Sequence, residues 1–518
     1  MLIANVLSAL NGTWSRRVEG HGLLEPGYNV KTRALQTHVH TMIWLCVGLF
    51  FACVGILLRP VRHRLPLPPG PRGLPVIGNI LDYPASDLGR GFRALAARYG
   101  SLVHLKILGH SIVAIDSYHT ARELLDKRSR NYADRPDAVM ARLRFFHQTL
   151  SLKTFESSYR PHIRKFAHDL LPNLLDNPVD FSRHIHHAFA ASVLNVGYGI
   201  EVSKDDDKYV NMLHSVHDLI EDAVVPGKYL VELFPTMQRL PSWFPGTRFR
   251  SDALFVRKGT QEVLHALYEE GKRRLASGNA KDSMLSATLQ RTSNFDSKAA
   301  AEEEEICARA LMTTYMAGSD TTMASLRAFF LAMTMYPDVQ KKAQVELDRV
   351  IGHTRLPDFE DRGSLPYLNA VVKELTRWHV VAPIGLPHAA LEDDEYDGLF
   401  IPRGAMIISN FWSYSRDPDV YPDPETFDPE RFLQDGKLSP GARDPYAYIF
   451  GLGRRVCPGR HLADASLFLA CASILHAFNI TPPLDENGHP VKLEAKVTTG
   501  LVISIRKWDS RLQRPAGV

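Results

Sequence analysis

The sequence predicts a mainly α-helical protein with a minor β domain, behind a single N-terminal transmembrane helix. From about residue 120 to 350, apolar residues recur at spacings of three and four, which is typical of amphipathic helices. Short β-rich runs flank this region, at 101–116, at 389–410 and in the C-terminal segment. An uncharged apolar run, 41–58, precedes the helical region and the β-rich runs and predicts the membrane span.

The composition excludes some classes of protein. The chain has 518 residues, of which 45% are apolar and 23% charged, so it can bury a large core. A formal net charge of +4 is small for this length and argues against a nucleic-acid partner. The cysteine spacing matches neither a disulfide framework nor a zinc site, which favours a reducing intracellular environment; the cysteines are Cys46, Cys53, Cys307, Cys457 and Cys471.

The apolar run 41–58 has the length of one membrane span. As a helix it measures about 27 Å, near the hydrocarbon thickness of an endoplasmic reticulum bilayer. A buried core helix is the alternative, and a secretory signal fits less well because the run starts far from the N-terminus. More basic residues follow the run than precede it, namely Arg59, Arg62, Arg64 and Arg72 against Lys31 and Arg33.

This asymmetry predicts the orientation. The positive-inside rule places the C-terminal part in the cytosol and the leader, 1–40, in the lumen of the endoplasmic reticulum. Asn11 in Asn11-Gly12-Thr13 is then a candidate glycosylation site, although such short motifs also occur by chance. The segment 59–75 is basic and rich in proline, which predicts a stiff, extended connector to the domain at 76–518.

Within this domain a hairpin is expected around Gly109-His110, and a long helix from near Glu302 to Met335. Four glutamates would lie in its first turn, where they suit the helix dipole. Further helices are expected at 367–379 and 460–478, with a break at 226–245 rich in proline and aromatic residues.

One segment, from Phe450 to Gly459, carries a specific chemical signal. Two glycines in three residues permit a tight turn before Cys457, and Pro458-Gly459 opens a helical pattern. A cysteine at a helix N-terminus is stabilised as the thiolate, which can ligate haem iron. A structural cysteine is the alternative. Gly451-x-Gly453 is not interpreted as a dinucleotide-binding motif, because the third glycine and the preceding strand of that motif are absent.

The segment resembles the haem-binding signature of the cytochrome P-450 superfamily, with all five fixed positions present: Phe450, Gly453, Arg455, Cys457 and Gly459. The resemblance covers about residues 66 to 510. It implies the cytochrome P-450 fold and haem b (iron-protoporphyrin IX) with Cys457 as the axial metal ligand. It also implies a monooxygenase that inserts one oxygen atom of dioxygen into a lipophilic small molecule.

Two further motifs agree with this resemblance. Glu374 and Arg377 are neighbours on one helix face, which alone would indicate only a surface salt bridge. The family pattern implies that both join Arg431 in a buried structural network. In the long helix, Gly318 would let a flat ligand approach closely. The Thr321 hydroxyl can donate a hydrogen bond to a backbone carbonyl oxygen of the preceding turn and bend the helix. A lone Asp-Thr-Thr can also be a cap, but the resemblance implies that Asp320 and Thr321 are the catalytic acid–alcohol pair that delivers protons.

The haem propionates need cations, and the resemblance indicates Arg455, His388 and Arg164. Arg164 is assigned on an early helix from which the family's tryptophan is missing, with Tyr159 or Arg160 in its place. Pro161 suggests that this helix starts late. An apolar substrate pocket is expected from residues that include Ala317, Val381, Ala382, Ile384, Val224, Val225, Phe234 and Leu501.

The chain has no flavin or nicotinamide motif, so the resemblance implies an NADPH-dependent flavoprotein reductase as electron donor, with cytochrome b5 as an optional second donor. The segments 198–200 and 226–235 resemble fungal microsomal members that oxidise secondary metabolites, which suggests a terpenoid substrate, with a polyketide or other aromatic compound as the alternative. A haem-thiolate isomerase or dehydratase is a rival class, against which Asp320 and Thr321 argue. A non-catalytic haem-binding protein is another.

Overall fold

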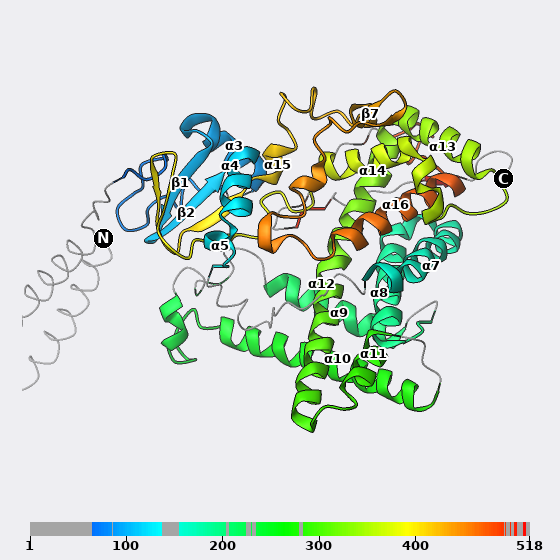
Figure 1. Ribbon diagram of the computed structural model, residues 1–518, viewed down its shortest axis with the longest axis horizontal. Coiled ribbons are helices and arrows are strands. Elements are labelled where there is room, and N and C mark those ends of the chain that lie inside the picture. The colour runs from blue at the N-terminus through cyan, green and yellow to red at the C-terminus, as the bar shows by residue number, and fades with distance from the viewer. Residues whose placement is uncertain are drawn as a thin grey trace, which may run out of the picture. The chain divides into compact units, whose positions relative to one another are not determined.

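Helices dominate the computed structural model of the chain, and small sheets accompany them (Figure 1). This confirms the predicted mainly α-helical class with a minor β part. No helix in the part of the chain that the structure describes is long and apolar enough to span a bilayer. The structure describes residues 65–84, 86–136, 155–203, 207–223, 229, 231, 235–278, 283–491, 493, 498, 502–504 and 511–513. The predicted leader with Asn11 and the predicted 41–58 helix lie outside these residues.

The largest sheet joins segments that are far apart in the sequence. The predicted hairpin is formed by β1 (Leu102–Ile107) and β2 (His110–Ile115), with Leu102 opposite Ile115. The strand β6 (Met406–Ser409) adds parallel to β2, and β3 (His388–Ala389) adds antiparallel to β6. Three two-stranded sheets complete the β structure: β4 (Asp394–Tyr396) with β5 (Leu399–Ile401), β7 (Leu433–Gln434) with β8 (Lys437–Leu438), and β9 (Asn479–Thr481) with β10 (Arg511–Gln513).

The described part of the proline-rich connector lies against this β structure. The carbonyl oxygen of Pro69 accepts the N–H of His104 at 2.9 Å, and that of Pro66 accepts the N–H of Phe400 at 2.7 Å. At Gly70 a Cβ atom would lie 2.0 Å from the His104 oxygen, so no larger residue fits there. The connector is therefore hydrogen-bonded to β5 at Pro66 and to β1 at Pro69.

The long helix α12 (Ser297–Met335) begins five residues before Glu302. The Asp296 side chain accepts the backbone N–H groups of Lys298 and Ala299, and this cap starts the helix earlier than its glutamates suggested. The prediction that four glutamates occupy the first turn was wrong, because they lie in the second and third turns. The helix ends before Pro337, as predicted.

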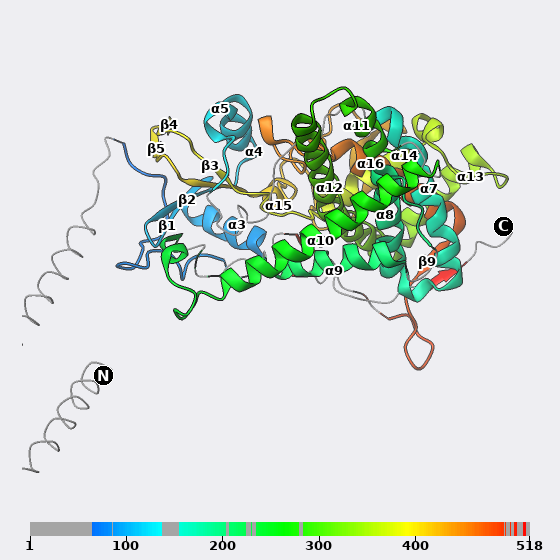
Figure 2. The ribbon, with the colours of Figure 1, turned by 90° about the horizontal axis from the view of Figure 1, so that it is seen from below.

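The other helices follow the expected order. The predicted helices 367–379 and 460–478 are α14 (Pro366–Trp378) and α16 (Arg460–Ala477). Of the remaining long helices, α9 (Lys208–Ala223) and α10 (Phe249–Ala276) run side by side (Figure 2). The remaining elements are α3 (Leu88–Tyr99), α4 (Tyr118–Ala121), the π-helix η1 (Arg122–Lys127), α5 (Ser129–Tyr132), α7 (Phe155–Asp176), η3 (Pro178–Asp180), α8 (Phe181–Tyr198), α9 (Lys208–Ala223), η5 (Pro235–Arg239), α10 (Phe249–Ala276), α11 (Met284–Thr292), α13 (Pro337–Ile351), η6 (Phe359–Ser364), α15 (Phe411–Tyr414), η7 (Pro429–Phe432), η8 (Pro445–Ala447) and η9 (Gly453–Arg455).

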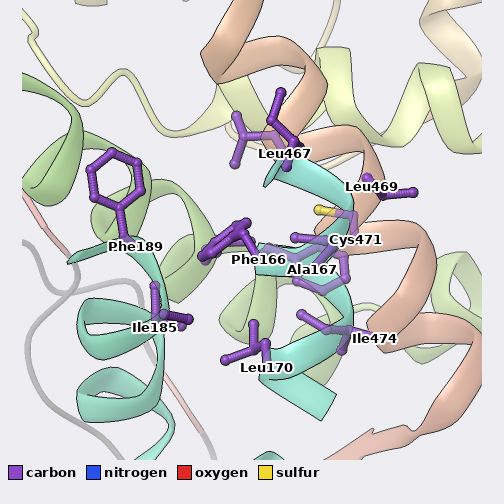
Figure 3. Packing of buried hydrophobic residues seen from close by; sticks show 14 of the residues in the cluster. Phe166, Ala167, Leu170, Ile185, Phe189, Leu467, Leu469, Cys471 and Ile474 are labelled. Atoms are coloured by element: carbon purple, nitrogen blue, oxygen red, sulfur yellow. The ribbon is translucent and has the colours of Figure 1, made fainter. Parts of the chain in front are cut away.

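The main hydrophobic core lies between α7, α8, α12 and α16. Phe166, Leu170, Leu467 and Ile474 are among its buried side chains, and Figure 3 shows them packed together with Cys471. The helix α7 contains Pro161 in its interior, so the prediction of a late start was wrong. Packing of α7 against α8 and α16 offsets the backbone hydrogen bond that proline cannot make.

Truncation of this core should destabilise the fold. Leu170 is fully buried, so Leu170→Ala should lower the free energy of unfolding by about 2–5 kcal/mol through lost burial and the cavity left behind. Leu175 lies on the same helix with 44% of its surface exposed, and Leu175→Ala should cost less than about 1 kcal/mol. Urea denaturation of both variants checks the difference. Equal losses would mean that α7 does not pack as described.

Candidate active site

The loop before Cys457 has a backbone that requires glycine. Gly453 has φ +60°, and a Cβ atom there would lie 2.0 Å from the Leu125 carbonyl oxygen. Gly451 also has positive φ, at +85°. The N–H of the next residue, Arg454, donates to the Ser129 hydroxyl at 3.0 Å. The loop is thus pressed against η1 and α5, and glycine is what makes this approach possible.

Cys457 lies two residues before Gly459, the N-cap of α16, and so just before a helix N-terminus, as the sequence predicted. Its N–H donates to the Phe450 carbonyl oxygen at 2.6 Å, which closes the loop. Its sulfur accepts the backbone N–H groups of Gly459, the N-cap of α16, and Arg460. Burial nevertheless raises the pKa of the Cys457 thiol, because these two donors and the Arg460 charge offset the desolvation only in part. The side chain keeps partial exposure, so a ligand can reach the sulfur.

Three basic side chains lie next to this loop and are called here the cationic cluster, after their two arginines: Arg135, His388 and Arg455. The backbone bridge between Asp134 and Ala389 holds the first two together, because it pairs the segment after α5 with β3. Each side chain is oriented by a backbone carbonyl oxygen at 2.6 Å: Arg135 Nη1 by Leu386, His388 Nδ1 by Tyr132, and Arg455 Nε by Ala133.

The electrostatics of this cationic cluster are unfavourable without an anion. Burial lowers the pKa of Arg135 to about 10, and the Arg455 charge adds to the effect. Burial also lowers the pKa of His388 to about 4, again with contributions from both arginines. Within the described residues, no carboxylate lies at ion-pair distance from Arg135. A bound dianion would therefore relieve the repulsion between these groups.

Glu374, Arg377 and Arg431 form the expected network. The Arg377 guanidinium donates from Nε and Nη2 to the Glu374 carboxylate at 2.6 and 2.7 Å, and both side chains have no exposed surface. Arg431 Nε donates to the same carboxylate at 3.2 Å. The remaining guanidinium donors reach backbone carbonyl oxygens, namely those of Ser415, Pro424 and Thr426 for Arg377, and Pro422 and Thr426 for Arg431.

Asp320 and Thr321 lie in the middle of α12. The Thr321 hydroxyl donates to the Ala317 carbonyl oxygen at 2.9 Å, as the sequence suggested. Ala317 is exposed and Thr321 is half-buried, so this face of α12 is open. The helix itself continues without interruption through both residues.

Gly318 serves a different contact from the one expected. A Cβ atom there would lie 2.5 Å from the Phe189 ring of α8. The glycine therefore allows close packing of two helices, and the expectation that it admits a flat ligand was wrong. The physical reason is that residues 318 and 317 point in different directions around α12.

A cavity of about 420 Å³ lies between α10 and α12 and is called here the α10–α12 cavity. Its apolar lining includes Val256, Leu264, Met312 and Met316, and its charged residues are largely paired within the wall. Examples are Glu304, which accepts from the Tyr268 hydroxyl, and Glu305, which pairs with Arg309. None of the eight predicted pocket residues is among its lining, and Val224, Val225, Phe234 and Leu501 lie outside the described residues.

Arg164 is not brought to the cationic cluster. Its guanidinium forms an ion pair with Asp358, with Nε 2.8 Å from the carboxylate, and Glu360 lies 3.9 Å away. This pairing raises the pKa of Arg164. Arg160, one turn earlier, is exposed and stacks on the Phe359 ring. The geometry gives no support to Arg164 as a propionate ligand.

Comparison with known proteins identifies the family. The cytochrome P-450 family model matches residues 68–502. The chain belongs to the cytochrome P-450 family. Similar proteins include cytochrome P-450 monooxygenase COX2 of Coprinopsis cinerea, 38% identical over 89% of this chain and 92% of that one. Others are monooxygenase claR of Ampulloclitocybe clavipes, 37% identical with 92% of each chain covered, and tryptamine 4-monooxygenase of Psilocybe cyanescens, 36% identical over 89% and 95%.

Membership makes the chain an oxygen-incorporating oxidoreductase with a cysteine-ligated haem. The residues present fit that cofactor. Cys457 offers a reachable sulfur, and the cationic cluster offers buried positive charge of the kind that haem carboxylates require.

Arg135 is the site residue that the sequence reasoning missed. Its segment, Ala133-Asp134-Arg135-Pro136, shows no periodicity and marks no motif. The long-range bridge to Ala389 and the hydrogen bonds to the Leu386 and Pro387 carbonyl oxygens place it beside His388.

Removal of the Glu374 charge should unfold this region. Glu374→Gln would leave Arg377 buried without its counter-ion, at a cost of about 3–5 kcal/mol in the free energy of unfolding. Glu430→Gln, which removes only an exposed pair with Lys342, should cost less than about 1 kcal/mol. Guanidinium denaturation of both variants, monitored by tryptophan fluorescence, checks this. A Glu374→Gln protein as stable as Glu430→Gln would contradict the buried network.

Loss of a cation from the cluster should weaken haem retention. Arg135→Gln should release haem to excess apomyoglobin about tenfold faster than wild type, the effect of losing one charge-assisted hydrogen bond. The exposed Arg90→Gln is the control and should change nothing. An unchanged release rate for Arg135→Gln would mean that this arginine does not contact the propionates.

Proposed function

We propose that the chain is a monooxygenase in which Cys457 is the axial ligand of haem iron and Arg135, His388 and Arg455 bind the propionates. The observation that carries the assignment is the Cys457 loop, whose glycine-dependent turn ends at the first residues of α16. The cationic cluster beside the same loop supports it, since Arg455 belongs to both.

Haem, when bound, supplies the oxygen activation, and the chain's own residues position groups around it. Asp320 takes protons from solvent and passes them to the Thr321 hydroxyl on the open face of α12. That hydroxyl is held by the Ala317 carbonyl oxygen and can redirect its proton by rotation. Glu374, Arg377 and Arg431 hold the surrounding backbone and take no part in the chemistry.

The substrate proposed is a lipophilic small molecule bound in the α10–α12 cavity. The cavity's α12 wall ends at Met316, one helical turn before Asp320, and this proximity to the catalytic pair supports the placement. A terpenoid of secondary metabolism is the substrate class we propose. An aromatic compound is the second candidate, favoured by the similarity to tryptamine 4-monooxygenase.

The electron donor proposed is a membrane-bound NADPH-dependent flavoprotein reductase, with cytochrome b5 as an optional second donor. The exposed Arg454 and the half-exposed Arg460 flank Cys457 and would attract an acidic partner surface. The apolar run 41–58 is the proposed anchor in the endoplasmic reticulum membrane, with the catalytic domain cytosolic and Asn11 lumenal.

The ligand assignment is tested by the carbon monoxide difference spectrum of the reduced protein. Wild type should show a strongly red-shifted Soret band that Cys457→Ser lacks, because a hydroxyl does not replace the thiolate. Cys307→Ser, which changes a buried cysteine of α12, should keep the band. A red-shifted band in Cys457→Ser, or none in haem-loaded wild type, would refute Cys457 as the ligand.

A further inference from the structure

His388 is the one member of the cationic cluster whose charge changes near neutral pH. Arg135 and Arg455 carry guanidinium groups, which stay protonated there even though burial lowers the pKa of Arg135 to about 10. His388 carries an imidazole, whose ordinary pKa is about 6.5. It is buried in β3, and this strand pairs with β6 of the largest sheet. A rigid element therefore holds the imidazole, and its protonation state decides what it offers to a ligand.

One hydrogen bond fixes which ring nitrogen of His388 carries the hydrogen. Nδ1 lies 2.6 Å from the carbonyl oxygen of Tyr132, and a carbonyl oxygen can only accept. Nδ1 therefore carries a hydrogen in every protonation state of the ring that keeps this bond. In the neutral imidazole the other nitrogen, Nε2, then has a lone pair and no hydrogen.

The residue that accepts this bond is itself held in place. Tyr132 belongs to α5, has no exposed surface, and donates its hydroxyl to the Asp394 carboxylate at 2.8 Å. Arg128 Nη1 donates to the same carboxylate at 3.0 Å. His388 cannot exchange its two nitrogens without losing the bond to Tyr132, so Nε2 is the nitrogen left for a ligand.

Without an anion the surroundings keep His388 neutral at pH 7. Burial is the main cause that lowers the pKa of His388 to about 4, and the charges of Arg135 and Arg455 lower it further. The Tyr132 carbonyl oxygen acts in the opposite direction and raises the pKa. Asp134, the carboxylate next to Arg135 in the chain, is exposed. The free site therefore offers two guanidinium groups and one acceptor nitrogen.

A haem propionate conflicts with this acceptor nitrogen. A carboxylate has only acceptor oxygens, so its lone pairs would meet the lone pair of Nε2 in the neutral imidazole. Protonation of Nε2 removes the conflict, because the imidazolium can donate a charge-assisted hydrogen bond to the carboxylate. The two arginines need no such change, since a guanidinium donates in the state it already has.

We propose that haem binds together with one proton, which enters the site at Nε2 of His388 and is donated to a propionate oxygen. The inference rests on the proposed function, in which His388 is a propionate ligand. The step is balanced: an acid in the solvent gives up one proton, one N–H bond forms at the imidazole, and no electron is transferred. The propionate charge drives the uptake, because a nearby negative charge favours the imidazolium.

The direction of the pH dependence follows from the two states of His388. The imidazole is neutral in the free site and protonated in the bound site, so the bound proton adds to haem affinity. This contribution is complete below about pH 4 and is lost as the pH rises through the raised pKa of the bound site. Haem should therefore leave the protein faster at alkaline pH.

The first test measures haem release from the full-length, haem-loaded protein to excess apomyoglobin between pH 6 and 9. Wild type should release haem about tenfold faster at pH 9 than at pH 6, the effect of losing one charge-assisted hydrogen bond. His388→Gln should release haem at one rate throughout, because its side-chain amide donates at any pH. His353→Gln changes an exposed histidine after α13; it is the control and should follow wild type.

The second test observes the proton itself and does not depend on release or turnover. The ferrous carbon monoxide complex is diamagnetic, so protein labelled with ¹⁵N-histidine can be studied by NMR in this state. The His388 signals are assigned by their loss in His388→Gln. Both ring nitrogens should carry hydrogen at pH 6, and the ring should titrate with a pKa above the ordinary imidazole value of about 6.5.

Two results would overturn the proposal. One is a neutral His388 imidazole at pH 6 in the haem-loaded protein. The other is a release rate of His388→Gln that rises with pH as steeply as that of wild type. Failure of the proposed function is recognised separately, because haem-loaded wild type would then lack the red-shifted carbon monoxide band.

Discussion

The carboxylate of Glu374 has no exposed surface, and the surrounding structure depends on keeping its charge paired. Two guanidinium groups meet it, and the N–H of Asp428 donates to it at 2.8 Å as a further bond. Arg377 extends the network to the backbone of Ser415, whose hydroxyl contacts the Tyr448 hydroxyl at 3.2 Å. Tyr448 opens the loop that leads to Cys457. A single buried charge thus ties α14 to the ligand loop by hydrogen bonds.

The opposite side of that loop is fixed by shape instead of charge. The backbone at Gly453 touches the Leu125 carbonyl oxygen in η1, and the N–H of Arg454 bonds Ser129 in α5. The segment after α5 pairs with β3 through the bridge between Asp134 and Ala389, and this pairing positions Arg135. The ligand loop and the cationic cluster are therefore positioned by the same short segment. A haem bound there would be held at its iron and at its carboxylates by neighbouring parts of one scaffold.

The sequence revealed the parts of the site whose residues are close together in the chain. Cys457 and its glycines form one contiguous motif, and Glu374 and Arg377 are a helical pair, so local spacing was enough. Arg431 followed from the resemblance, and the structure places it at the same carboxylate. Arg135 was missed because a bridge between distant segments places it, which no local pattern encodes.

Other expectations failed because they depend on which surfaces meet. Gly318 was read as room for a ligand, yet the neighbouring helix fills that space with Phe189. Arg164 was expected near the propionates, but the structure pairs it with Asp358 from the segment before η6.

The residues around Cys457 act on its thiol in opposite directions. The sequence indicated that a helix N-terminus would stabilise the anion, and the donors at Gly459 and Arg460 are present. Burial outweighs these donors and raises the pKa of the Cys457 thiol. A metal ion bound at the sulfur would favour the thiolate. The same logic holds for Arg135, whose buried charge lacks a carboxylate among the described residues. A cofactor with a metal ion at Cys457 and carboxylates at Arg135 would therefore stabilise the groups on both sides of this site.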